Sequence, residues 1–331
     1  MDPVAALRRI AFLLERRLES SYRIKAYRGA ANALADLRPE DVRRLSENGA
    51  LTRVKGVGDK TAAVAAEALA GDMPAYLAKL EETAGQLAEG GETFRAALRG
   101  DLHTHSNWTD GGSPPEEMAE TYVAVGHEYA ALTDHSPRLT VARGLSAERL
   151  REQIGLVGEL NERLAPFRIL KGIEVNIRAN GDLDVEDELL APLDWVMASV
   201  HSSFDNDPTG RVLHAMESPH VDCVGHLTSR KIGKRDPSTI AVEKVVGHAL
   251  ETGTFLEINS QPDRLDLRDA HARLAGEAGL KLVVSSDGHS AGALGYVDLG
   301  IAQARRAWLT KEQILNTRPW AEIERLRKGA E

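Results

Sequence analysis

The sequence predicts an α/β protein in which a small all-helical domain precedes a barrel of parallel strands. Residues 2–98 hold Ala-rich and Leu-rich segments with 3.6-residue periodicity, separated by Pro and Gly. From residue 100 onward, short β-branched or apolar runs alternate with helical segments, which is the pattern of βα units. With 331 residues, the chain has room for one barrel and a small extra domain. We expect the helical domain over residues 1–95 and the barrel over residues 99–331.

The amino-terminal part contains five helix-like segments and no strand-like run. In chain order they are PVAALRRIAFLLERRLE, YRIKAYRGAANALADL, PEDVRRLSENG, GDKTAAVAAEALAG and PAYLAKLEETAGQLAEG. Seven strand-like runs follow: GDLHTHS, YAALTDHS, RILKGIEVNI, WVMASVHSS, VDCVGHLTS, TFLEINSQ and KLVVSSDGHS. The segment AEGGETFRAALRG, which lies between the two parts, is the one candidate linker.

Composition narrows the class of protein. Apolar residues make up 42% and charged residues 27%, so disordered and membrane proteins are not expected. No apolar run approaches the roughly 20 residues of a membrane span, and the charged amphipathic start does not resemble a signal sequence, so we expect a cytoplasmic protein. The single cysteine, Cys223, lies among apolar residues and is expected to be a buried thiol.

The charge is unevenly distributed. Residues 1–60 hold 13 Lys or Arg and 8 Asp or Glu, so they carry +5, whereas the whole chain carries −9 and the remainder −14. This pattern suits an acidic metal-binding enzyme with a basic phosphate-binding attachment. Chance variation on solvated helix faces explains it equally well.

Six of the seven strand-like runs end in residues that can bind a metal. Because the carboxyl ends of parallel barrel strands converge on one face, we expect these side chains to share one pocket. In order they are His103, His105 and Asp110; Asp134 and His135; Glu174; His201; His226; and Asp287 and His289. On a strand, His103 and His105 would point to the same face. Glu174 is the only carboxylate from a middle strand, and a carboxylate can bridge two cations, so several ions are implied.

The motifs DLHTHS, LTDHS, GIEV, SVHSS, GH and SSDGH resemble those of the polymerase and histidinol phosphatase (PHP) domain. The resemblance covers residues 100–325 and is strongest to the PHP domain of bacterial family X DNA polymerases. It implies a distorted seven-stranded β/α barrel with three metal ions. One ion would be held by His103, His105, Glu174 and Asp287; a second by Glu174, His201 and His226; and the third by Asp110, His135 and His289. Asp101 and Asp134 would orient neighbouring imidazoles, with surface capping as the alternative for Asp134.

The helical part resembles the small lyase domain of polymerase beta, with its helix-hairpin-helix element. The resemblance lies in AYRGAANAL and LTRVKGVGDKTAAVAAEAL. Gly56 and Gly58 would allow a tight turn and present backbone N–H groups to a DNA phosphate, with Lys55 and Lys60 beside them. The Schiff-base lysine of the family is replaced here by Val64, so lyase chemistry by that route is not expected. No polymerase palm separates the two parts, so polymerisation is not expected either.

Clustered divalent ions generate hydroxide at neutral pH and neutralise charge on a phosphoryl group. The His-rich ligand set suits Mn²⁺, Zn²⁺ or Fe²⁺, and Glu174 and Asp287 are the expected catalytic residues. Four arginines near strand ends are candidates for binding phosphate: Arg143, Arg178, Arg230 and Arg264. The chemistry expected is metal-dependent phosphoester hydrolysis by metal-activated hydroxide.

Three functions remain open at this point. The first is a phosphoesterase acting on DNA 3′ ends, as a 3′-5′ exonuclease or a 3′-phosphatase. The second is a small-molecule phosphatase resembling histidinol phosphatase. The third is a DNA-binding or regulatory protein with an inactive barrel, against which the complete ligand set speaks. The helix-hairpin-helix resemblance favours DNA as the partner and therefore the first function.

Overall fold

The computed structural model describes residues 1–17, 19–83 and 87–328, and the chain divides into two compact units. Unit 1 spans Met1–Leu87 and unit 2 spans Ala88–Glu331.

The described residues of unit 1 form helices joined by turns, with no strand. Its helices are α1 (Pro3–Arg16), α2 (Ser21–Ala35), α3 (Pro39–Glu47), α4 (Asp59–Leu69) and α5 (Ala75–Glu82), with a short 3-10 turn, η1 (Leu51–Arg53), before α4. Helix α1 begins at Pro3, and the Asp2 carboxylate before it accepts a hydrogen bond from the Ala5 N–H at 2.7 Å. Leu7, Ile10 and Leu14 follow at helical spacing and are buried. They form one apolar stripe, which packs α1 into the unit.

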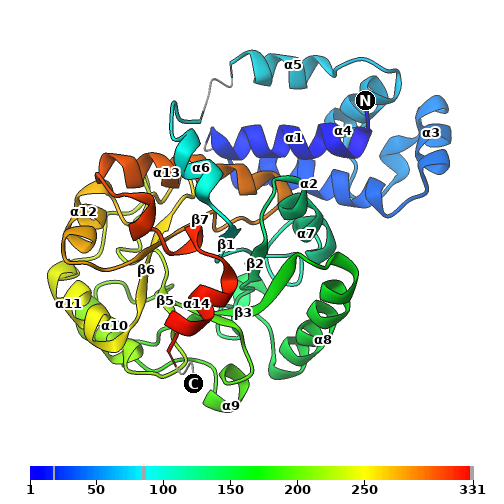
Figure 1. Cartoon of the computed structure of the whole chain (residues 1–331). Helices are drawn as coiled ribbons and strands as arrows, with labels where there is room; N and C mark the ends of the chain where they lie inside the picture. Colours follow the sequence, from blue (N-terminus) through cyan, green and yellow to red (C-terminus); the bar gives the residue numbers. More distant parts are fainter. Residues whose placement is uncertain (18, 84–86, 329–331) are drawn as a thin grey trace. The chain divides into compact units, whose positions relative to one another are not determined.

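Unit 2 contains seven parallel strands that pair in chain order, from β1 to β7. They are β1 (Gly100–Asp101), β2 (Tyr129–Leu132), β3 (Arg168–Asn176), β4 (Trp195–Ser199), β5 (Cys223–Val224), β6 (Phe255–Asn259) and β7 (Leu282–Ser285). Figure 1 shows the strands at the middle of unit 2, with helices around them. The predicted α/β fold with seven parallel strands in a nearly closed barrel is confirmed.

Helices connect successive strands, as the βα pattern requires. They are α7 (Pro115–Ala124), α8 (Ala147–Leu164), α9 (Asp187–Leu190), α10 (Pro208–Met216), α11 (Val242–Thr252) and α12 (Asp269–Glu277). Helix α6 (Glu92–Ala97) precedes β1, and α13 (Val297–Arg306) and α14 (Trp320–Leu326) follow β7. Short 3-10 turns lie in the loops: η2 (Thr140–Ala142), η3 (Ala291–Tyr296), η4 (Lys311–Gln313) and η5 (Leu315–Thr317).

The alternation of side chains along each strand builds two cores. Phe255 and Val283 belong to an inner cluster to which all seven strands or the residues next to them contribute, so these side chains fill the barrel. Leu256 and Val284, one position further, belong to the layer between the strands and the helices. Helix α14 contributes Trp320 to the inner cluster, where its ring lies 5.9 Å from that of Tyr129, the first residue of β2. Apolar side chains therefore fill the barrel at the amino-terminal ends of its strands, and the polar groups lie at the carboxyl ends.

Asn316 joins the two outermost strands of the sheet. Its buried side-chain amide donates to the carbonyl oxygens of Gly100 in β1 and Val284 in β7, each at 2.7 Å. Its Oδ1 accepts from the Val284 N–H at 3.1 Å, and its own carbonyl accepts from the Arg99 N–H at 2.9 Å. One asparagine thus supplies hydrogen bonds to both edges, where direct pairing is limited to the bridge between Thr104 and Gly288.

Candidate metal centre

The segment His-Thr-His, residues 103–105, lies just beyond β1, because the strand ends at Asp101. The expectation that both histidines belong to one strand is therefore not met. The segment is held instead by the parallel bridge between Thr104 and Gly288 and by the His105 N–H, which donates to the Gly288 carbonyl at 2.9 Å. Both imidazoles are fully buried and reach the same carboxylate, that of Glu174. The two histidines thus point the same way, as predicted from the alternation of side chains along a strand, although they lie outside the strand.

Glu174, the seventh residue of β3, lies among five imidazoles that come from four neighbouring strand ends. Its Oε1 lies 3.0 Å from His226 Nε2, 3.4 Å from His201 Nε2 and 3.5 Å from His103 Nε2. Its Oε2 lies 2.8 Å from His135 Nδ1 and 3.5 Å from His105 Nε2. The side chain is only 1% exposed. Each oxygen of one carboxylate therefore faces its own set of histidines, which is the arrangement of a bridging ligand.

Asp287 approaches the cluster from beyond β7. Its Oδ1 lies 3.2 Å from His105 Nε2 and 3.8 Å from His103 Nε2. The backbone of Asp287 has φ of +49°, and that of His226, beyond β5, has φ of +27°. Both residues hold a left-handed conformation that costs free energy outside glycine, and such residues concentrate at functional sites.

Asp110 forms the more open side of the cluster. Its Oδ1 lies 3.4 Å from His135 Nε2 and 3.5 Å from His289 Nε2. The imidazole of His105 is stacked against those of His135 and His289, with both centroid distances 4.3 Å. The Asp110 side chain is 36% exposed and that of His289 is 22% exposed, whereas His103 and His105 are 0% exposed. The cluster is therefore open to solvent at Asp110 and His289.

Three groups of these side chains have ligand atoms close enough together to hold a metal ion. They are His105, Asp110, His135 and His289; His103, His105 and Glu174; and His135, Glu174 and His201. These groups hold seven of the nine residues of the predicted ligand set, and they share members differently from the three predicted sets. The other two lie against them, with His226 Nε2 3.0 Å from Glu174 Oε1 and Asp287 Oδ1 3.2 Å from His105 Nε2.

The buried nitrogens of the cluster fit the demands of bound cations. Among the described residues, the Nε2 atoms of His103, His105 and His201 and the Oε2 of Glu174 are buried without a hydrogen-bond partner. A buried polar atom with no partner costs free energy, and coordination to a metal removes that cost. Imidazole nitrogens combined with carboxylate oxygens suit Zn²⁺, Mn²⁺ and Fe²⁺.

The electrostatics of the chain favour the metal-binding forms of Glu174 and His105, whereas at His103, His135 and His289 burial lowers the pKa but the neighbouring carboxylates outweigh it and raise the pKa. Burial raises the pKa of Glu174, but the imidazoles of His201, His103 and His135 outweigh it and hold that pKa well below its usual range. Burial, together with the neighbouring His135 and His289, lowers the pKa of His105 to about 3. Glu174 is therefore an anion and His105 a neutral imidazole at neutral pH, the states in which each coordinates a cation.

The two carboxylates that were expected to orient imidazoles make other contacts. Asp134 accepts from the Ser106 N–H at 2.9 Å and from Gln153 Nε2 at 2.7 Å. Asp101 accepts from the Ser286 N–H at 3.2 Å and from the Tyr122 hydroxyl at 3.2 Å. Asp134 adjoins His135 in sequence, so along extended backbone the two side chains point to opposite faces. Both aspartates therefore hold the loops that carry the histidines, and within the described structure neither carboxylate forms a hydrogen bond or ion pair with an imidazole.

Sequence reasoning missed Glu257 of β6, the run to which no ligand was assigned. Its Oε1 lies 2.6 Å from His103 Nδ1, and both side chains are fully buried. The signal that could have found it is its spacing, because Glu257 is two residues after Phe255 and must share its inward face.

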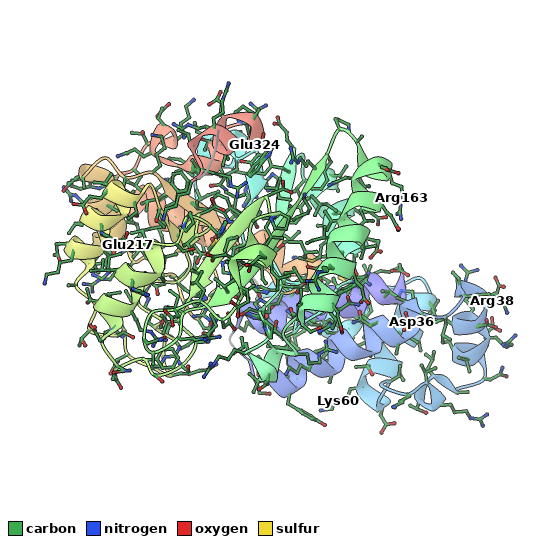
Figure 2. All side chains as sticks on the ribbon, turned by 90° about the horizontal axis from the view of Figure 1, so that it is seen from below. Asp36, Arg38, Lys60, Arg163, Glu217 and Glu324 are labelled. Carbon is green, nitrogen blue, oxygen red and sulfur yellow. The ribbon has the colours of Figure 1, made fainter. Side chains whose placement is uncertain are left out.

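The glycines of the predicted hairpin lie between η1 and α4 in unit 1. Gly56 has φ of +98°, a conformation that requires glycine, and Gly58 caps the start of α4. The Gly58 N–H donates to the Thr61 hydroxyl at 3.0 Å, so this amide is engaged within the turn. Lys55 and Lys60 are exposed, and Figure 2 shows Lys60 at the surface.

A groove of about 650 Å³ lies beside this turn and includes Gly56, Gly58 and Lys60 in its lining. Tyr22, Tyr27, Tyr76 and Arg23 also line it. Val64, at the position of the family's lysine, lines the same groove and has no nucleophilic atom.

Two family models match the chain, a helix-hairpin-helix domain over residues 1–73 and a PHP domain over residues 101–261. The chain is 42% identical over 231 residues to the DNA polymerase/3′-5′ exonuclease PolX of Bacillus subtilis (strain 168). That alignment covers 69% of this chain but only 40% of PolX. A probable phosphatase of Thermoanaerobacter sp. (strain X514) is 30% identical over 232 residues, covering 65% of this chain and 90% of the phosphatase. The chain belongs to the PHP domain family.

A solved structure supports the same fold for the PHP domain. The crystal structure of a candidate histidinol phosphatase, hisK, from Listeria monocytogenes has a TM-score of 0.51 and 16% identity, covering 59% of this chain and 97% of that one. As a member of the PHP family, the protein is a hydrolase of phosphate esters. None of its described helices combines the length and the apolar character needed to cross a membrane.

Of the four predicted arginines, one contacts the metal cluster of the PHP domain. Arg264 Nε lies 3.6 Å from Asp287 Oδ2, and its side chain is 12% exposed. Arg230 instead donates to the Arg264 carbonyl at 2.6 Å, and Arg143 donates to the Asn107 carbonyl at 3.1 Å. Arg178 lines a separate cavity beside α10. Arg143 and Arg230 thus brace loops, and Arg264 is the one of the four predicted arginines that pairs with a carboxylate of the cluster.

Proposed function

We propose that the PHP domain is a metal-dependent phosphoesterase that acts on the 3′ ends of DNA, as a 3′-5′ exonuclease or a 3′-phosphatase. The observation that carries the proposal is the position of Glu174, whose two oxygens face imidazoles from four different strand ends. A carboxylate shared in this way suits a site with several cations, and such sites stabilise the charge that develops in phosphoryl transfer.

The proposed ligands are the nine residues predicted from the sequence, holding three ions of Mn, Zn or Fe. Divalent ions bound here would supply a nucleophile at neutral pH and neutralise charge on the phosphoryl group. The chain itself contributes position. Glu174 and Asp287 are buried, so their carboxylates stay in place while the substrate enters past the half-exposed Asp110.

Arg264 is the proposed phosphate-binding residue. Its guanidinium lies beside Asp287 and is mostly buried. Burial lowers the pKa values of His226 and His201, and the positive charge of Arg264 acts in the same direction. A buried guanidinium keeps little water of its own and can form paired hydrogen bonds to two phosphate oxygens. We assign it the role of orienting the phosphoester towards the metal ions.

Unit 1 supports DNA as the substrate. It matches a helix-hairpin-helix domain, and its exposed Lys55 and Lys60 flank a turn whose glycines allow close approach of a phosphate backbone. PolX, which shares the PHP region, is named as a 3′-5′ exonuclease. The chain spans less than half of the length of PolX, so the 3′-5′ exonuclease activity is proposed for this protein and does not follow from the similarity alone.

A small-molecule phosphatase is the second candidate. Residues 61–331 carry a net charge of −14, which opposes a polyanionic strand and does not hinder a small phosphate ester. A relative of which the chain covers 90% is named as a probable phosphatase.

The deciding experiment assays one metal-loaded preparation against three substrates: an oligonucleotide with a 3′-hydroxyl, the same oligonucleotide with a 3′-phosphate, and histidinol phosphate. Release of nucleotides or of 3′-phosphate at rates well above that for histidinol phosphate would support the DNA function. Preference for histidinol phosphate would overturn it in favour of the second candidate. The Glu174→Ala protein, purified identically, controls for a contaminating nuclease.

A further inference from the structure

Glu257 is a fully buried carboxylate inside the barrel, next to the metal cluster and outside the proposed ligand set. It lies in β6, two residues after Phe255, whose ring belongs to the inner apolar cluster. A buried carboxylate without partners destabilises the folded state, so Glu257 must be compensated by its surroundings.

Four donors surround this carboxylate and satisfy both of its oxygens. Oε1 accepts from the Ser285 hydroxyl and lies 2.6 Å from His103 Nδ1. Oε2 accepts from the His226 N–H at 2.7 Å and from Asn259 Nδ2 at 3.0 Å. Asn259 Nδ2 also donates to Asp287 Oδ2 at 2.9 Å. Glu257 is therefore linked to three proposed ligands that come from beyond β1, β5 and β7.

The contact with His103 determines which of its nitrogens can bind a metal. A carboxylate only accepts hydrogen bonds, so the proton in the 2.6 Å contact lies on the Nδ1 side. The other nitrogen, Nε2, is buried without a hydrogen-bond partner and lies 3.5 Å from Glu174 Oε1 and 3.8 Å from Asp287 Oδ1. His103 is thus held with Nε2 facing the other ligands.

We propose that Glu257 is a positioning residue of the metal centre: it holds His103 as the Nδ1–H tautomer and keeps the His226 backbone and, through Asn259, the Asp287 carboxylate in place. The inference rests on the proposed metal-dependent function, and it adds a residue that acts on the ligands and not on the substrate. Carboxylates behind metal-binding histidines typically contribute 10–100-fold to metal affinity.

Glu257→Gln is the sharpest substitution, because glutamine has nearly the same shape. If its amide oxygen faces His103 and Ser285, its NH₂ group opposes the N–H of His226 and the NH₂ of Asn259. If the amide is flipped, its NH₂ group faces His103 Nδ1, which must then accept and leave the proton on Nε2. Either orientation disturbs a ligand while the volume of the core is unchanged.

Asp222→Asn is the matched control. Asp222 is also a buried carboxylate, and it accepts from the Val196 N–H at 2.8 Å and from Arg327 Nε at 3.0 Å. It lies at the residue before β5, and its partners are outside the cluster. Asp222→Asn therefore shows how far the loss of a buried carboxylate changes the protein when no proposed metal ligand is involved.

The first measurement is the affinity of the metal-stripped full chain for Co²⁺, from titration in competition with a chelator while the visible absorption of the bound ion is recorded. We expect Glu257→Gln to weaken binding about 10–100-fold and to alter the absorption spectrum, and Asp222→Asn to leave both unchanged. Equal affinity and spectra for Glu257→Gln and the unmodified chain would overturn the inference. A chain that binds no Co²⁺ at all would instead overturn the proposed metal-dependent function.

The second measurement needs no variant and therefore does not depend on whether Glu257→Gln folds. In the Zn²⁺-loaded chain labelled with ¹⁵N-histidine, nitrogen chemical shifts distinguish the two tautomers of each imidazole. We expect His103 to carry its proton on Nδ1. A proton on Nε2 would overturn the inference.

Discussion

His135 Nδ1 lies 2.8 Å from Glu174 Oε2, so a residue beyond β2 and a residue near the carboxyl end of β3 meet at the oxygen that also faces His105. The opposite oxygen of Glu174 faces a different set of histidines. The two halves of the cluster therefore depend on one carboxylate, and its removal should affect both.

Replacement of Glu174 by Ala is expected to lower the rate of phosphoester hydrolysis more than about 100-fold, beyond the effect of a residue that acts from behind a ligand. His226→Ala removes one imidazole and should cost less. The measurement pairs the hydrolysis rate of each metal-loaded variant with its metal content by elemental analysis. We expect more than one ion per chain in the unmodified protein and fewer in Glu174→Ala. A loss at His226 as large as that at Glu174 would contradict the bridging role.

Removal of metal is expected to lower the melting temperature of the chain. Without cations, several buried nitrogens of the cluster have no hydrogen-bond partner among the described residues, and coordination would remove that cost. A ligand at a thousand times its dissociation constant stabilises the folded state by about 4 kcal/mol, which corresponds to roughly 10 °C for a domain of this size. Calorimetry with and without a chelator checks this, and the melting temperature of Glu174→Ala should respond much less.

The location of the site could be predicted because parallel strands place their carboxyl ends on one face. His135, Glu174 and His201 each follow from that rule once their strands are recognised. The rule does not say which residues would share an ion. That grouping depends on side-chain directions in the loops beyond β1 and β5, and these two strands are only two residues long.

Glu257 and Asn316 show what sequence patterns leave out. Glu257 was passed over because a single acidic residue in an apolar run predicts nothing by itself, and its meaning comes from His103, which is 154 residues away. Asn316 bonds to Gly100 across 216 residues, and no local pattern encodes such a pairing. Asp101 and Asp134 were assigned to imidazoles through their proximity in sequence, whereas their side chains point to backbone and hydroxyl donors.

Asn316→Ala is expected to lower the free energy of unfolding by about 2–4 kcal/mol, because it leaves the carbonyl oxygens of Gly100 and Val284 buried without their donor. Asn161→Ala is the matched control. Asn161 also bonds to one strand residue in both directions, at 2.9 and 2.7 Å from Ile169, but it is half-buried and joins no second strand. Denaturant unfolding compares the two, and an equal loss would show that Asn316 does not hold the sheet edges together.

Asp222 is expected to make stability fall as pH rises from about 4 to 6. Burial raises the pKa of its carboxyl to about 6, although Arg327 beside it acts in the opposite direction. The folded chain therefore holds this proton more tightly than the unfolded chain does, and the stabilisation present at low pH is lost as pH passes through 6. The check is the difference in unfolding free energy between the unmodified chain and Asp222→Asn across this range. A difference that does not vary with pH would contradict the raised pKa.

Lys60→Ala is expected to raise KM for oligonucleotides while leaving hydrolysis of a small chromogenic phosphodiester unchanged. The lysine lies in unit 1, whereas the metal cluster is built entirely from residues of unit 2. Its ammonium group is exposed beside the hairpin turn and is free to contact a phosphate of the strand.

The salt dependence of oligonucleotide affinity tests directly whether Lys60 contacts a phosphate. Each phosphate contact that is lost should reduce the slope of log affinity against log salt by about 0.7–0.9. Lys79→Ala removes an equally exposed lysine from α5, outside the lining of the groove, and should leave the slope as it is. If Lys55→Ala and Lys60→Ala both behave like Lys79→Ala, the hairpin does not bind the strand. The acidic PHP domain would then be better explained as a phosphatase of small molecules.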